Sequence, residues 1–106
     1  MAEQTEAERN EEIELFVHRF SREAFELARA FVTGDASEGL KRQAVELKTR
    51  LPEVVARARE ASEAYRPDLN LALSEANLDV EYVLAGGDRP SSIRLGHLIG
   101  ELDAER

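Results

Sequence analysis

The sequence contains no cysteine and no tryptophan, and only two histidines, His18 and His97, among its 106 residues. The lack of cysteine excludes disulfide bonds and thiolate metal ligands. His18 has Glu14 and Arg22 four residues away on either side, a spacing that favours a charge network on a helix surface over a set of metal ligands. No Glu-x-x-His pattern occurs, which excludes a ferritin-like di-iron bundle. We therefore predict no metal site, no cofactor and no catalytic residues.

Long apolar runs are also missing. No stretch approaches the roughly 20 apolar residues that cross a membrane. The first ten residues are polar and acidic, unlike a signal peptide, and we expect residues 1–10 to be frayed or disordered. These features predict a cytoplasmic protein that has no contact with membranes. Aromatic residues make up only 6% of the chain, so the core must be built mainly from leucine, valine and alanine.

Positive charge is in short supply. The chain has 14 basic and 22 acidic residues and a formal net charge of -8, which argues against a general affinity for nucleic acid. The two signs are unevenly distributed. Residues 36–66 carry five acids and seven bases, whereas residues 67–85 carry four acids and no base. The stretch 36–66 is the only net-positive part of the chain.

What the sequence does have is helical periodicity. Apolar residues recur at steps of three and four and predict helices over residues 6–32, 40–65, 68–85 and 90–102. Short connections make successive helices antiparallel neighbours. The prediction is an all-α chain with one domain, residues 1–106, folded as an up-down-up-down antiparallel four-helix bundle with a short fourth helix.

Local signals mark the ends of these helices. Gly34 and Gly86-Gly87 are expected to end the first and third helices, because glycine tolerates the left-handed conformation found there. Asp35, with Glu38 three residues later, fits a capping box for the second helix. Ser91 or Ser92 is expected to cap the fourth helix.

The second predicted helix contains a proline near its middle. Pro52 has no amide hydrogen, and its ring crowds the carbonyl of Lys48, at a cost of roughly 3 kcal/mol in an ordinary helix. We therefore expect the helix to kink or restart at Pro52.

The third predicted helix is apolar on two sides. One side is suited to the core of the bundle. The other carries Leu71, Leu78 and Tyr82, which need more cover than one bundle provides. These three residues are predicted to face another subunit, which makes the protein a homo-oligomer.

Several short motifs, in order, resemble a known family. The second helix has Gly39-Leu40 and Gln43, then Leu51-Pro52, then Val55-Ala56. The third helix has Ser74, Leu78 and Asp79, and the last has Leu95, Leu98, Ile99 and Leu102. Over roughly residues 13–102 the chain resembles the four-helix-bundle proteins encoded in intervening sequences of bacterial large-subunit (23S) rRNA genes. That family includes the accessory variability protein of diversity-generating retroelements.

The resemblance implies more than the fold. It implies a homo-pentamer, and a non-enzymatic scaffold or accessory protein whose partner contains RNA or a reverse transcriptase. The residues available for such a partner are the bases of the central stretch, because they are the only concentrated positive charge. This candidate partner-binding basic strip comprises Lys41, Arg42, Lys48, Arg50, Arg57, Arg59 and Arg66. The same bases would also be explained by pairing with the acidic first or third helix.

One enzymatic alternative is left open by the acidic residues. All-α nucleotide pyrophosphatases hold magnesium between paired acidic motifs on facing helices. Glu60 and Glu63 have the spacing of half such a motif, while Glu75 and Asp79 are one residue further apart. The alternative function is therefore a magnesium-dependent all-α nucleotide pyrophosphatase-like enzyme, although acidic pairs at helical spacing usually mark a solvated face.

Overall fold

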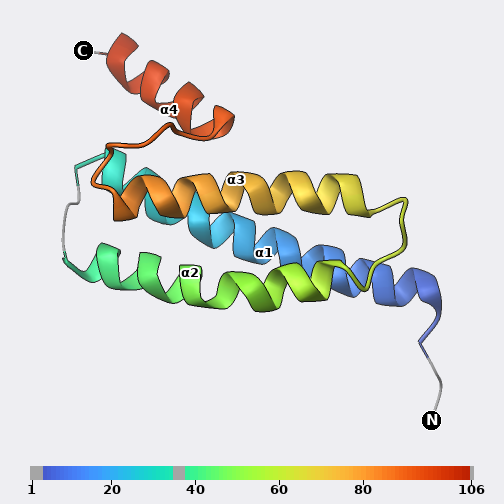
Figure 1. Cartoon of the computed structure of the whole chain (residues 1–106). Coiled ribbons are helices and arrows are strands. Elements are labelled where there is room, and N and C mark those ends of the chain that lie inside the picture. Colours follow the sequence, from blue (N-terminus) through green and yellow to red (C-terminus); the bar gives the residue numbers. More distant parts are fainter. Residues whose placement is uncertain (1–3, 35–37, 106) are drawn as a thin grey trace.

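The computed structural model describes residues 4–34 and 38–105 and places four α-helices in them (Figure 1). These are α1 (Glu6–Val32), α2 (Glu38–Ala58), α3 (Arg66–Leu84) and α4 (Ile93–Ala104). No strand occurs in these two ranges. The prediction of an all-α chain with four helices is confirmed.

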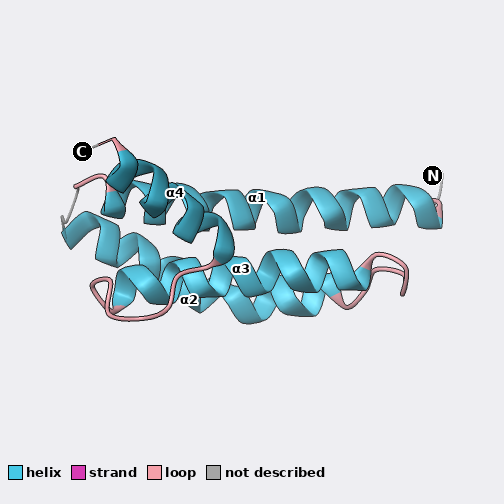
Figure 2. Cartoon of the chain, turned by 90° about the horizontal axis from the view of Figure 1, so that it is seen from above, coloured by secondary structure: helices cyan, strands magenta, loops and turns pink. Residues whose placement is uncertain are grey.

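The three long helices lie side by side and form the body of the molecule, which measures 55 × 27 × 20 Å (Figures 1 and 2). Their apolar faces meet in a single core. Small side chains are frequent in it, which lets the helix backbones approach closely. The fully buried residues include Ile13, Val17, Ala24, Ala44, Val54, Leu69, Ala76, Val80 and Val83.

The helix α1 starts at Glu6, where the periodicity predicted it. Thr5 caps the helix by accepting a hydrogen bond from the backbone N–H of Glu8 at 3.1 Å. One turn later, Asn10 is only 5% exposed. Its side chain donates to Oγ of Ser62 at 3.0 Å and accepts from the backbone N–H of Ser62 at 3.0 Å. The fraying expected for residues 1–10 stays a prediction, and residues 1–3 lie outside the described part.

The helix α2 is shorter than predicted. It continues through Pro52 without interruption, so the expected restart at the proline does not occur, but it ends at Ala58 instead of Tyr65. Residues 59–65 form turns, with backbone bonds such as Ala61 N–H to the carbonyl of Ala58 at 3.2 Å. The periodicity extended further because Ala61, though in a turn, is still buried at 1% exposure. The predicted cap, Asp35, lies outside the described residues.

The short α4 does not lie antiparallel beside α3 as an up-down-up-down bundle requires. The chain leaves α3 through Gly86 and Gly87, both with positive φ (63° and 86°), and turns back over the helix. From there α4 runs at a slant away from the long helices (Figures 1 and 2). It contacts α1 and α3, and among the described residues it has no contact with α2.

No helix in the described ranges is long and apolar enough to span a bilayer.

Candidate partner-binding surfaces

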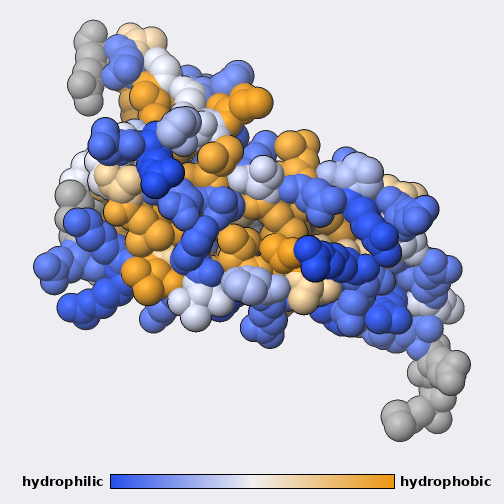
Figure 3. All heavy atoms as spheres, viewed as in Figure 1, coloured by the Kyte–Doolittle hydropathy of each residue, from blue (hydrophilic) through white to orange (hydrophobic). Residues whose placement is uncertain are grey.

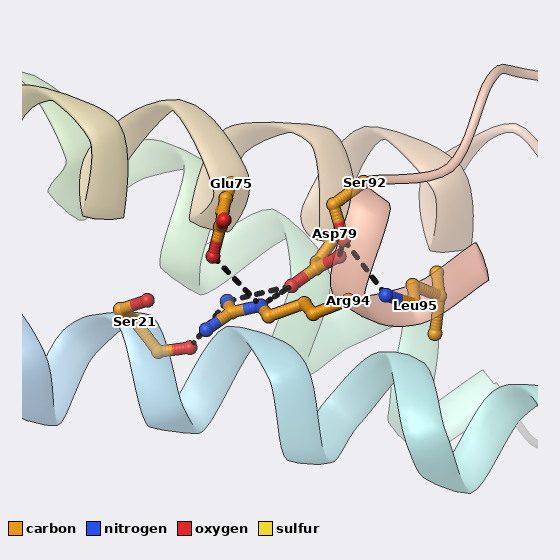
Figure 4. Close-up of polar contacts among 6 residues, drawn as sticks. All are labelled: Ser21, Glu75, Asp79, Ser92, Arg94 and Leu95. Atoms are coloured by element: carbon orange, nitrogen blue, oxygen red, sulfur yellow. Dashed lines mark hydrogen bonds and ion pairs between the residues drawn. The ribbon is translucent and has the colours of Figure 1, made fainter. Parts of the chain in front are cut away.

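A buried carboxylate determines where α4 begins. Asp79 of α3 is 0% exposed and lies among core residues. One of its oxygens accepts a hydrogen bond from Oγ of Ser92 at 2.5 Å. The other accepts from Nε and Nη2 of Arg94 at 3.0 and 2.7 Å (Figure 4). We call these three residues the α4 anchor. They hold the first turn of α4 beside Asp79, more than one turn before α3 ends at Leu84. The loop of residues 85–92 therefore has to fold back along α3.

Arg94 is bound on several sides. Its Nη2 donates to the backbone carbonyl of Ser21 on α1 at 2.9 Å, and its Nε lies 3.5 Å from the carboxylate of Glu75. The guanidinium group also lies over the ring of Phe25, 5.0 Å from the centroid. One side chain of α4 therefore contacts both α1 and α3, as Figure 4 shows for Ser21, Glu75 and Asp79.

Ser92 has two roles in the anchor. Its hydroxyl donates to Asp79 and accepts from the backbone N–H of Leu95 at 3.2 Å, so it is also the N-cap of α4. The sequence predicted a cap at Ser91 or Ser92, and the structure selects Ser92. The ion pair of Asp79 and Arg94 was not anticipated. Its signal was an aspartate three residues after buried Ala76 and four before buried Val83, on the core side of α3.

The bases of the predicted strip do not form one continuous surface. Lys48 points toward α3, where Nζ lies 2.6 Å from Glu81 and 2.7 Å from Oδ1 of Asn77. Arg50 points toward α1, where Nη1 lies 3.0 Å from Glu23 and the guanidinium lies 5.5 Å from the centroid of the Phe20 ring. These two bases therefore lie on opposite flanks of α2 and pair within the bundle.

Two further members of the strip make local contacts near the end of α2. Arg57 pairs with Glu60 at 2.8 Å, and Nε of Arg66 donates to the carbonyl of Ala61 at 3.0 Å. The remaining members, Lys41, Arg42 and Arg59, are exposed. Lys41 and Arg42 border a shallow hollow on the outer side of α2 that also includes Val45, which is 54% exposed.

The pair of Lys48 and Glu81 has an electrostatic consequence. The hydrogen bond from Lys48, and then its charge, hold the pKa of Glu81 below the ordinary value of 4.5. The lysine therefore stabilises the ionised form of Glu81 and links α2 to α3.

The residues predicted to face another subunit differ in exposure. Leu71 is 60% and Leu78 is 38% exposed, and both lie on the outer side of α3. Tyr82 is half-buried, and its ring packs edge-to-face on Phe31 of α1 with centroids 5.9 Å apart. Figure 3 shows apolar surface, in orange, across the face formed by α2 and α3.

The acidic residues of the enzymatic alternative are not arranged as paired motifs on facing helices. Glu60 lies in the turn after α2 and is bonded to Arg57. Both oxygens of Asp79 are occupied by Ser92 and Arg94. Within residues 4–34 and 38–105, no three carboxylate or histidine side chains are close enough to share an ion.

Comparisons with models of protein families, with curated proteins and with solved structures give no match to this chain. The resemblance to the proteins of rRNA intervening sequences stays a prediction.

Proposed function

We propose that the protein is a non-enzymatic scaffold or accessory protein that self-assembles and holds a partner. The observation that carries this proposal is the outer side of α3. Leu71 and Leu78 are seven residues apart, so they lie on one side of the helix, and both expose apolar surface. Single exposed leucines are ordinary, but an aligned pair on one side of a helix favours contact with another protein.

The assembly is proposed to consist of copies of this chain, with the homo-pentamer of the resembled family as the expected form. Leu71 and Leu78 would lie in the contact between copies, and Tyr82 would support them from its position on Phe31. Pro52 is proposed to kink α2 and thereby to shape its outer side.

The partner is proposed to be a protein, such as a reverse transcriptase, or a complex that also contains RNA. The exposed Lys41, Arg42 and Arg59 are the bases available for RNA. The internal pairing of Lys48 and Arg50 and the net charge of -8 favour contact with protein over direct contact with RNA.

Light scattering coupled to size-exclusion chromatography tests self-assembly. We expect a molar mass several times the 11.9 kDa of one chain. A monomer at all concentrations would contradict the proposal. Titration of labelled RNA at low salt tests whether the protein contacts RNA itself. Tight binding that weakens steeply with salt would show direct RNA recognition.

A further inference from the structure

A groove between α1 and α3 is left open beyond the start of α4. In Figure 2, seen from above, α4 lies over one part of these two helices, and no helix among the described residues lies over the part nearer the N-terminus of α1. The groove has a volume of about 310 Å³. Its lining residues are Glu14, His18, Ser21, Asp68, Leu71, Ala72, Glu75 and Arg94.

The covered part of the same groove shows what it accepts. There α4 inserts Leu95, which is 0% exposed, between α1 and α3. The adjacent Arg94 places its guanidinium on Asp79, at 2.7 Å, and near Glu75, at 3.5 Å. Leu98 and Ile99 of α4 are partly buried against the same core, so the groove holds a helix through a short apolar stripe and one neighbouring cation.

The open part offers the same two kinds of contact. Ala72, 8% exposed, lies at the core side of the groove, and Leu71, 60% exposed, lies at its edge. Three carboxylates surround them, from Glu14 on α1 and from Asp68 and Glu75 on α3. Of these, Glu75 lies 3.5 Å from Arg94, the residue of α4 that also lines the groove, whereas within the described ranges Glu14 and Asp68 lie on the groove wall without a bond to Arg94.

We propose that the open part of the α1–α3 groove binds a basic amphipathic helix of a partner protein. Its apolar side chains would pack on Ala72 in the floor of the groove, and its arginines or lysines would pair with Glu14 and Asp68, as Arg94 pairs with Asp79. This inference rests on the proposed accessory function and names the chemistry of the partner. Helix-in-groove docking of this kind buries an apolar stripe and uses flanking charges for orientation.

A designed peptide tests the proposal with the full chain. The probe is a fluorescent amphipathic helix with leucine and alanine on one side and arginine beside them. A matched peptide carries glutamate in place of each arginine. We expect the basic peptide to bind, with an affinity that falls as salt rises, and the acidic peptide not to bind. Equal binding of both, or no binding of the basic peptide, would overturn the proposal.

Matched variants separate the groove from general attraction to an acidic protein. Glu14→Lys with Asp68→Asn changes the groove, and Glu46→Lys with Glu53→Gln makes the same charge change on exposed positions of α2. We expect the groove variant to lose about tenfold in affinity and the α2 variant to stay within about twofold. Equal losses would mean that net charge alone attracts the peptide, and would overturn the proposal.

The location and the oligomeric state give two further readouts. On peptide binding, amide NMR shifts should concentrate in residues 11–21 and 68–75, and shifts centred elsewhere would overturn the groove assignment. A wild-type oligomer that the groove variant dissociates would show that a second copy occupies the groove, which also overturns it. If the protein is an oligomer that binds no peptide, self-assembly is supported and the groove proposal fails. If it is a monomer that binds the basic peptide specifically, the groove proposal is supported and self-assembly fails.

Discussion

The carboxylate of Asp79 and the guanidinium of Arg94 form a two-bond ion pair, with Nε and Nη2 at 3.0 and 2.7 Å from the same oxygen. Asp79 is completely buried, whereas the side chain of Arg94 is 27% exposed. Arg94 therefore compensates the free-energy cost of burying the charge of Asp79 away from water.

Replacing Arg94 with Met should destabilise the protein by about 3 kcal/mol, because Asp79 would keep a buried charge that Ser92 alone cannot compensate. Urea denaturation followed by circular dichroism measures the free energy of unfolding. The double variant Asp79→Leu/Arg94→Met should lose less than the single Arg94→Met variant, since no uncompensated charge remains. If the double variant loses the sum of the losses of the Asp79→Leu and Arg94→Met single variants, the role assigned to the pair is contradicted.

Removing the side chain of Asn10 should cost about 1–2 kcal/mol, because the backbone N–H of Ser62 would lose its acceptor in a partly buried place. Asn10→Ala should also speed amide hydrogen exchange in the turns of residues 59–65. Asn70→Ala, at an exposed position of α3, is the control and should change the free energy of unfolding by less than about 0.5 kcal/mol.

The link between Lys48 and Glu81 should depend on pH in one direction. The folded-state pKa of Glu81 lies below 4.5, so the contribution is present above that pH and is lost as pH falls through the lowered pKa. Lys48→Met should therefore destabilise the protein by up to about 1 kcal/mol at neutral pH and by little near pH 3. Chemical denaturation at both pH values gives the comparison, and an equal loss at both would show that packing, not charge, links the helices.

Replacing Pro52 with Ala should give a folded helical protein of equal or greater stability. Alanine restores an amide hydrogen within reach of the Lys48 carbonyl, and the proline it replaces costs roughly 3 kcal/mol in an ordinary helix. If Pro52 shapes the surface used for self-assembly, the molar mass from light scattering should fall while helicity is kept. A loss of helicity before any loss of assembly would count against this role.

Introducing charge on the outer side of α3 should separate assembly from folding. Leu71 and Leu78 are exposed, so Leu71→Lys/Leu78→Lys should change the free energy of unfolding of the single chain little. It should nevertheless lower the molar mass, because buried lysines are costly in a contact between copies. Ile93→Lys, at a 77% exposed position of α4, is the control and should leave the mass unchanged.

Helical periodicity was enough to predict the four helices, and it located α1 to the residue, because its apolar stripe is long and uninterrupted. It failed at the end of α2. Ala61 and Tyr65 keep the spacing of a helix, but the side chain of Asn10 accepts a hydrogen bond from Ser62 N–H, a contact between residues 52 positions apart. The Ser62 N–H thus bonds to a side chain of α1 instead of continuing the helix, and only the packing of α1 beside this turn reveals it.

The position of α4 could not be predicted from the sequence for a related reason. A loop of a few residues suggests an antiparallel neighbour, and nothing local shows that Asp79 will hold Ser92 and Arg94. The basic strip was similarly separated by folding, because Lys48 and Arg50, two residues apart, lie on opposite flanks of a helix. The exposed Leu71 and Leu78, in contrast, could be located from spacing alone.

The hydroxyl of Ser92 makes two hydrogen bonds, and these make α4 a cooperative unit. This hydroxyl both begins the helix and ties it to Asp79, and Gly96 and Gly100 give the segment little helical tendency of its own. When α4 separates from α3 it loses its cap at the same moment, so detachment and unwinding are one event. The C-terminal segment should therefore be the first part of the molecule to exchange its amide hydrogens, and it should do so all together.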